Sequence, residues 1–185
     1  NVHPGEGKDT MINASLVAIE INNCLPSMET PRGTEDYEGF YHLISMQGEV
    51  GEAKLNYIVR DHDKNGFEER KKTLRLIEKN LNAKWGEGTV TLKITDQYLN
   101  MKEIVEEHMH LIDHAKKACE AAGVAPLILP IRGGTDGCQL SFKGLPCPNL
   151  GTGGHAFHGP YEHISVEGME KSVELLLALI QEYTK

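Results

Sequence analysis

The sequence lacks four features, each of which would have pointed to a class of protein. No apolar run approaches the ~20 residues of a membrane-spanning helix, and no charged-then-apolar leader opens the chain. Positive charge is not in excess: the formal net charge of -8 argues against nucleic acid or an anionic membrane as the main partner. The four cysteines could form two disulfides, but they lack the paired short spacing of a structural zinc site. We therefore expect a cytoplasmic protein with free thiols and no nucleic-acid or membrane partner.

At 185 residues the chain has room for one domain or two small ones. Hydrophobic periodicity in the first half predicts the order helix, strand, strand, helix, strand. These elements cover residues 8–25, 40–46, 52–60, 68–82 and 89–98. The polar segment 27–39, which contains proline and glycine, is expected to be a loop. This α-β-β-α-β order is that of a ferredoxin-like split βαβ unit with its first strand missing.

The second half has a different pattern. A long helix is predicted over 102–122, ended by Gly123, then a short apolar strand over 124–130 and a short helix near 139–142. Ser165 is a good N-cap for a final helix. Its expected buried face consists of Met169, Val173, Leu176, Leu177 and Ile180. These elements fit an incomplete α/β segment, because too few strands are present for a whole sheet. The fold class expected for the chain is α+β.

The chain starts at Asn1, without methionine, on a segment that we expect to be functional. We interpret it as a fragment of a longer protein. The alternative is a complete protein that has been processed or cleaved from a tag.

Glycine and proline are most concentrated in residues 131–163. This stretch contains the motifs RGGTDG at 132–137, LPCPNLG at 145–151 and FHG at 157–159. So many turns bring the backbone close to other groups, and binding residues often lie on loops held by a rigid scaffold. Arg132 and Asp136 lie at one end of the stretch, and His155 and His158 lie near the other. The plainer interpretation is a Gly-rich connector between two strands.

These motifs, in this order and with Glu162 nearby, resemble the C-terminal end of the tripeptide aminopeptidases (the peptidase T group) of the di-zinc metallopeptidase family. That family also includes carnosinase-like dipeptidases and aminoacylases. The opening NVHPG at 1–5, followed by KDTMINA at 8–14, resembles the start of the family's lid domain, which is a βαββαβ insertion. The resemblance implies a lid or dimerisation domain over 1–101, lacking its first strand. Residues 102–185 would be the C-terminal part of the catalytic domain.

The resemblance also implies roles for four residues. His158 matches a ligand of one of the two zinc ions, and neutral imidazole suits zinc. His3 matches the lid histidine that hydrogen-bonds the substrate's carbonyl oxygen as it becomes an oxyanion. In several relatives this histidine reaches into the active site of the neighbouring subunit. Arg60 and Arg132 are candidates to hold a peptide's terminal carboxylate. Surface ion pairs with Asp61 or Glu35 are the alternative for these arginines.

Most of the family's metal ligands are not recognisable in this sequence. They comprise a His-x-Asp, a bridging Asp, a Glu-Glu pair and a further Asp, all of which precede the lid in the family. A cluster of His108, His110, Asp113 and His114 has metal-like spacing, but a solvated helix face is the better interpretation. We therefore expect two zinc ions in the full-length enzyme, none bound by this chain alone, and no activity from the isolated chain.

The expected function is that of a fragment of a di-zinc aminopeptidase that releases the N-terminal residue of tripeptides. Its expected partners are a peptide substrate and a second copy of itself, through the lid domain. A related dipeptidase or aminoacyl hydrolase is the alternative within the same chemistry. A non-catalytic module that self-associates through the edge of the lid sheet is the alternative from another class.

Overall fold

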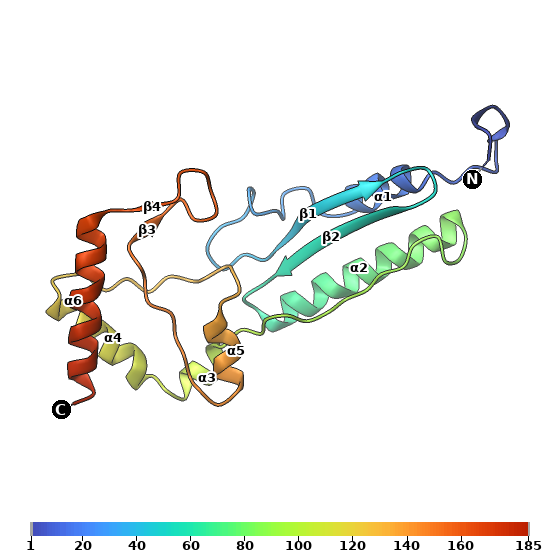
Figure 1. The fold of residues 1–185 in the computed structure, drawn as a ribbon. Coiled ribbons are helices and arrows are strands. Elements are labelled where there is room, and N and C mark those ends of the chain that lie inside the picture. The colour runs from blue at the N-terminus through green and yellow to red at the C-terminus, as the bar shows by residue number, and fades with distance from the viewer. Residues whose placement is uncertain (1, 185) are drawn as a thin grey trace. The chain divides into compact units, whose positions relative to one another are not determined.

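A computed structural model describes residues 2–184 (Figure 1). Asn1, the first residue of the opening motif, lies outside the described residues. The chain divides into two compact units, Asn1–Thr95 with Pro130–Gly133, and Asp96–Leu129 with Gly134–Lys185. Helices are combined with small antiparallel sheets, so the α+β prediction is confirmed. Among the residues described, no helix combines the length and the apolar character that crossing a membrane requires.

The first unit is built on a β-hairpin. Strands β1 (Phe40–Gly48) and β2 (Ala53–Arg60) pair antiparallel from Phe40↔Arg60 to Gly48↔Ala53, with a register shift between Leu43 and Ser45. Both predicted strands are confirmed. A backbone bond from Tyr41 N–H to the Glu29 carbonyl, 2.9 Å long, holds the preceding loop beside the start of β1.

Two helices lie along the hairpin (Figure 1). Helix α1 (Ala14–Asn23) begins at Asn13, whose side chain accepts bonds from the backbone N–H groups of the first turn. The predicted start at residue 8 is therefore wrong by one and a half turns. Helix α2 (Lys64–Trp85) is longer than predicted, because the Asp63 side chain caps it at the Gly66 N–H. The core between the elements comprises Leu25, Tyr41, Ile77 and Leu81.

The predicted strand over 89–98 is absent from the described structure. Its backbone groups bond to side chains of α2 instead of to a neighbouring strand. The Asn82 amide both accepts from the Val90 N–H, at 2.8 Å, and donates to the Val90 carbonyl, at 2.9 Å. The Glu78 carboxylate accepts from the Leu92 N–H at 2.6 Å. High β-propensity does not make a strand unless a partner strand is present.

The second unit contains four helices and one short ribbon among its described residues. They are α3 (Lys102–Glu106), α4 (His110–Ala121), α5 (Asp136–Phe142), β3 (Gly154–His155), β4 (His163–Ile164) and α6 (Val166–Glu182). The predicted helix over 102–122 is broken at 107–109, where tight turn bonds such as Leu111 N–H to the His108 carbonyl replace the helical pattern. Gly123, with φ +71°, ends α4 as predicted. The expected strand over 124–130 does not form, and its Leu127 side chain is 77% exposed.

Helix α6 begins after the predicted cap, because the Ser165 hydroxyl accepts from the Gly168 N–H at 2.9 Å. Its predicted buried face is wrong: all five of those side chains are at least 46% exposed. The less exposed positions are instead Ser172, Leu175 and Leu179, at helical spacing. Helix α6 packs against α4, and the Lys171 ammonium donates to the Ala122 carbonyl at the end of α4. Helix α6 is thus apolar on two faces, of which the described residues cover one.

Candidate functional site

His158 lies on the loop that joins β3 to β4. Two residues of this loop that are not glycine have left-handed backbones: Ala156 with φ 55° and His158 with φ 62°. The His158 backbone N–H donates to Oε2 of Glu162 at 3.0 Å, and the Gly159 N–H donates to the Ala156 carbonyl at 3.0 Å. The side chain of His158 is exposed, so the loop presents this imidazole outward and does not pack it into a core.

Two more histidines lie at the base of the same loop. His155 and His163 are register partners across β3 and β4, and their ring centroids are 5.4 Å apart. Nδ1 of His163 lies 2.7 Å from the Tyr161 carbonyl oxygen, so this nitrogen carries the hydrogen and donates it. The ribbon is attached to α6, because the Ser172 hydroxyl donates to the Thr152 carbonyl at 2.9 Å.

A buried serine connects the first two Gly/Pro motifs. The Ser141 hydroxyl, in a residue only 2% exposed, donates to the Gly137 carbonyl at 2.7 Å and accepts from the Cys147 N–H at 3.0 Å. Gly137 must be glycine here, because a Cβ would lie 2.5 Å from the Cys147 carbonyl oxygen. Ser141 was not predicted from the sequence, although a lone hydroxyl between Leu140 and Phe142 is a signal that it bonds to a buried polar group.

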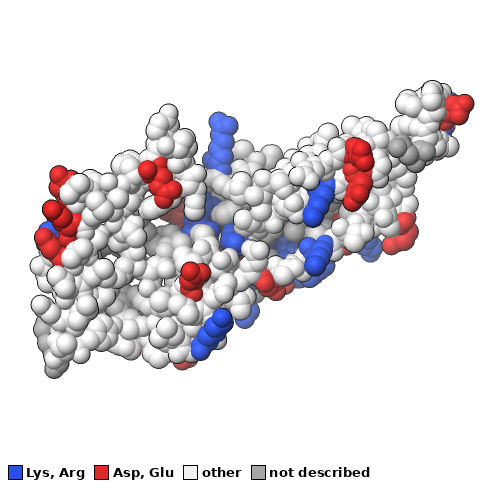
Figure 2. Space-filling view, in the orientation of Figure 1, with Lys and Arg blue, Asp and Glu red and all other residues white. Residues whose placement is uncertain are grey.

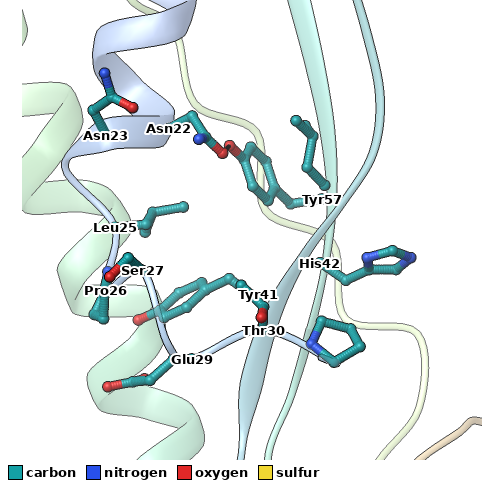
Figure 3. A pocket seen from close by; sticks show the side chains of 12 residues that line it. Asn22, Asn23, Leu25, Pro26, Ser27, Glu29, Thr30, Tyr41, His42 and Tyr57 are labelled. Carbon is teal, nitrogen blue, oxygen red and sulfur yellow. Dashed lines mark hydrogen bonds between the residues drawn. The ribbon is translucent and has the colours of Figure 1, made fainter. Parts of the chain in front are cut away.

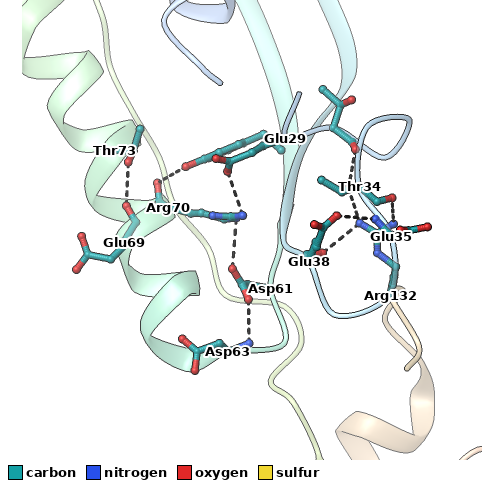
Figure 4. A network of polar contacts seen from close by, with 12 residues as sticks. Glu29, Thr34, Glu35, Glu38, Asp61, Asp63, Glu69, Arg70, Thr73 and Arg132 are labelled. Carbon is teal, nitrogen blue, oxygen red and sulfur yellow. Dashed lines mark hydrogen bonds and ion pairs between the residues drawn. The ribbon is translucent and has the colours of Figure 1, made fainter. Parts of the chain in front are cut away.

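Arg132 lies in the first unit, although its motif continues into the second. Its guanidinium donates to the Thr34 carbonyl at 2.6 Å, to the Thr34 hydroxyl at 2.5 Å and to the Glu38 carbonyl at 3.1 Å (Figure 4). It also lies over the Phe40 ring, with Cζ 4.9 Å from the centroid. Arg60 is the register partner of Phe40 on β2 and donates to the Val59 carbonyl. The structure thus brings both predicted arginines to the start of the hairpin.

The acidic residue beside Arg60 belongs to a separate network. Asp61 pairs with Arg70 of α2, with 3.4 Å between Oδ2 and Nε, and Arg70 also pairs with Glu29 at 3.0 Å (Figure 4). The Asp61 carboxylate additionally accepts from the Asp63 N–H at 2.8 Å. This network joins the loop before β1, the end of β2 and the first half of α2. Arg70 was not predicted from the sequence, because charged residues along a helix usually face solvent.

His3 lies at the other end of the hairpin. It caps the short helix η1 (Pro4–Glu6), and its Nδ1 accepts from the Gly5 N–H at 3.2 Å. The Ala14 N–H bonds to the Val50 carbonyl at 3.0 Å, so the segment that contains His3 leads away from the β1–β2 turn (Figure 1). Strand β1 spans roughly 26 Å at ~3.3 Å per residue. His3 is therefore not brought to the arginines within one copy of the chain.

The histidine cluster at the start of α4 makes ring contacts. The centroids of His108 and His110 are 5.9 Å apart, those of His110 and His114 are 6.1 Å apart, and His114 meets Tyr183 edge-on at 4.6 Å. Across residues 2–184, no group of three or more His, Cys, Asp or Glu side chains could hold a metal ion. The imidazole of His158 is a donor that suits zinc, but a metal site needs several ligands. The described residues of this chain therefore do not form a complete metal site.

A hollow of about 500 Å³ lies where α1, the following loop and the hairpin meet (Figure 3). The Tyr57 hydroxyl donates to Oδ1 of Asn22 at its edge, at 2.9 Å. Burial raises the pKa of both Tyr41 and Tyr57. The hollow contains none of the four predicted site residues. Its lining is Asn22, Asn23, Leu25, Pro26, Ser27, Glu29, Thr30, Pro31, Tyr41, His42, Leu43 and Tyr57.

Charge on the first unit is mixed. On the face drawn in Figure 2, Lys and Arg are interspersed with Asp and Glu over the hairpin and its helices. This face offers no continuous basic surface of the kind that binds a polyanion.

The chain belongs to Peptidase family M20/M25/M40, whose family model matches residues 5–182. Among its relatives are two proteins named Peptidase T. One, from Clostridium perfringens (strain 13 / Type A), is 54% identical over the whole chain, and the chain covers 46% of it. The other, from Caldanaerobacter subterraneus subsp. tengcongensis, is 51% identical over the whole chain, which covers 45% of it.

Solved structures support the fold. The aminopeptidase PepT from Bacillus cereus ATCC 10987 aligns with a TM-score of 0.64 at 20% identity, over the whole of this chain and 49% of that one. A tripeptidase from Staphylococcus aureus aligns with a TM-score of 0.62 at 16% identity, over 98% of this chain and 48% of that one. The chain thus spans slightly less than half the length of the relatives that it matches. The resemblance predicted from the motifs is confirmed.

Proposed function

We propose that this chain supplies the lid and the C-terminal part of the catalytic domain of a cytoplasmic di-zinc tripeptide aminopeptidase. The observation that carries the proposal is the 51–54% identity to proteins named Peptidase T over all 185 residues. The proposed division is 1–101 for the lid and 102–185 for the catalytic segment. The boundary between the compact units, at Thr95 and Asp96, supports this division, although Pro130–Gly133 belongs to the first unit.

His3 is the proposed donor to the oxyanion, and its hydrogen bond supports that role. Because Nδ1 accepts from the Gly5 N–H, the neutral ring carries its hydrogen on Nε2. The free nitrogen is therefore a donor, as a group that stabilises a developing negative charge must be. The position of His3 beyond the far end of the hairpin fits a role in the site of a second copy of the chain.

Arg60 and Arg132 are the proposed partners of the peptide's terminal carboxylate. Both lie beside Phe40, where a planar guanidinium can pair with a carboxylate through two parallel bonds. Arg132 already makes three bonds to Thr34 and Glu38. These bonds give Arg132 the additional role of holding the neighbouring loop, and Arg60 and Arg132 are both proposed to bind the carboxylate.

His158 is the proposed ligand for one zinc ion, and the remaining ligands must come from outside this chain. Bound zinc would supply an activated water as the nucleophile. This chain's own residues would hold one metal, orient the peptide by its carboxylate and donate a hydrogen bond to the carbonyl oxygen. The isolated chain should accordingly be inactive.

The test compares the isolated chain with the enzyme encoded by the complete gene. Both are assayed against a free-acid tripeptide with added zinc, with release of the N-terminal residue measured by chromatography. We expect hydrolysis by the complete enzyme and none by the isolated chain. Robust hydrolysis by the isolated chain, free of contaminating protease, would overturn the proposal that the chain is an inactive fragment. His108, His110 and His114 would then be the candidate metal ligands. Cleavage of dipeptides or acylated amino acids in preference to tripeptides would favour the related hydrolases.

Self-association through the hairpin is the second candidate function. Among the described residues this sheet has two strands, so each strand has an outer edge that no other strand pairs, although the Tyr41 N–H at the start of β1 already bonds to the Glu29 carbonyl. Pairing of two copies there would form a homodimer. Light scattering after size-exclusion chromatography tests it. A dimer whose formation is abolished by Met46→Pro, on β1, would support pairing at that edge, and a monomer at all concentrations would exclude it.

A further inference from the structure

The loop that presents His158 contains an unusual backbone conformation that two hydrogen bonds support. A left-handed φ is disfavoured for residues with a Cβ, so a histidine with φ 62° needs its surroundings to hold it there. One support is the turn over 156–159, closed by the Gly159 N–H, which donates to the Ala156 carbonyl at 3.0 Å. The other comes from four residues later in the chain, where Oε2 of Glu162 accepts the His158 N–H at 3.0 Å. A bond from an N–H to a carboxylate is stronger than one to a neutral acceptor.

The rest of the loop holds Glu162 in place. The Glu162 N–H donates to the Gly159 carbonyl at 3.1 Å, and the next residue, His163, pairs with His155 across the ribbon. Glu162 is thus fixed by its backbone on one side of the loop, while its side chain reaches across to the other side. The contact adds to the turn bond in holding φ at residue 158, and φ at this residue determines the direction in which its Cβ and imidazole leave the backbone.

We propose that Glu162 is a positioning residue: its carboxylate holds the backbone of His158 in the left-handed conformation and so aims the imidazole at the metal. The inference rests on the proposed function for its consequence at the metal, but the backbone contact itself is a property of this chain. Glu162 touches neither substrate nor metal in this scheme. It acts through the geometry of His158 alone.

The first measurement uses the chain as it is. Amide hydrogen exchange, followed by NMR, is recorded for wild type, Glu162→Ala, Glu162→Gln and the control Glu170→Ala, which removes an exposed carboxylate from α6. We expect exchange at the His158 amide to accelerate roughly tenfold or more in Glu162→Ala. Glu162→Gln, which retains an acceptor oxygen, should restore most of the protection, and Glu170→Ala should leave it unchanged.

Two results would overturn the proposal. One is unchanged exchange at His158 in Glu162→Ala. The other is an equal acceleration at the Gly154 and Ile164 amides, which would make Glu162 a general support of the ribbon with no specific hold on His158.

The second measurement uses the complete enzyme and reads metal content. After dialysis, Glu162→Ala should retain less of one of its two metals and show a lower kcat at similar KM, while Glu162→Gln should resemble wild type. If exchange at His158 responds as expected but both metals stay tightly bound, the positioning of His158 stands and its assignment as a zinc ligand fails. The failure of this inference and that of the proposed function are therefore distinguishable.

Discussion

Arg70 and Asp61 form an ion pair that is largely shielded from solvent. Nε lies 3.4 Å from Oδ2, and the two side chains are 17% and 9% exposed. Glycine on either side makes room for the carboxylate, because a Cβ at Gly39 or Gly66 would lie 2.3 or 2.6 Å from the same oxygen. The pair fixes the end of β2, and with it the residue before Asp61, which is Arg60.

Arg70→Ala should lower the free energy of unfolding by about 2–3 kcal/mol, because it leaves a buried carboxylate without its cation. Urea denaturation of the chain measures the change. Arg75→Ala, an exposed arginine on the same helix, is the control and should cost less than about 0.5 kcal/mol. Equal losses from the two variants would show that the ion pair contributes nothing beyond the helix itself.

Glu20 should make stability depend on pH. Its carboxylate accepts from the Lys84 ammonium at 2.5 Å and the Trp85 indole at 2.9 Å, and these bonds hold the pKa of Glu20 below its usual 4.5. The unfolded chain then binds the proton more readily, so the stabilisation is complete above pH 4.5 and is lost as pH falls through the lower, folded pKa.

The stability of Glu20→Gln should therefore fall less steeply than that of wild type as the pH is lowered below 4.5. Thermal unfolding at a series of pH values measures this slope. Glu87→Gln, at an exposed position, should keep the wild-type slope. Parallel curves for Glu20→Gln and wild type would refute the assignment.

Asn82 replaces a strand partner for the segment after α2. Asn82→Ala should cost about 2 kcal/mol, since it removes two bonds and leaves both polar groups of Val90 unpaired. Asn80→Ala, two residues away on the exposed side of the same helix, should be nearly neutral. Hydrogen exchange at the Val90 amide gives the local readout, and exchange as slow as in wild type would contradict the prediction.

His3 and Arg60 should separate kinetically in the complete enzyme. A donor that acts only on the oxyanion stabilises the transition state more than the bound substrate, so His3→Ala should lower kcat about 10²–10³-fold with KM nearly unchanged. Arg60→Ala should act mainly through KM on a free-acid tripeptide and have little effect on the amidated peptide. If Arg60→Ala lowers activity equally on the free acid and the amide, Arg60 has a structural role, and the role of binding the carboxylate is assigned to Arg132.

Local sequence predicted the elements whose partners are close in the chain. The hairpin strands alternate clearly and are joined by a short turn, and α2 has a long apolar stripe with a capping residue at its start. The stretches 89–98 and 124–130 have strand-like composition but no partner strand among the described residues, and no local pattern can report that. Helix α6 shows the same limit: its sequence offers two apolar faces, and only packing decides which one α4 covers.

The roles of His3, Arg60, Arg132 and His158 stay predictions. They come from the resemblance of their motifs to the family, to which the chemistry of imidazole and guanidinium adds support. Glu162 and Ser141 could not be assigned their contacts in this way, because they bond to backbone groups whose positions depend on a left-handed residue and on a close approach at Gly137. Such contacts depend on the three-dimensional course of the backbone, which a local sequence pattern does not show.

The uncovered apolar face of α6 should make association of the isolated chain depend on temperature. This face consists of Met169, Val173, Leu176, Leu177 and Ile180. Burial of apolar surface is driven mainly by entropy near room temperature, and the attraction weakens on cooling. Contacts between these faces on different copies should therefore strengthen as a solution is warmed and weaken as it is cooled. Excluded salts such as sulfate should act in the same direction as warming. Warming and added sulfate should therefore both promote association of the isolated chain through the face of α6 that α4 leaves uncovered.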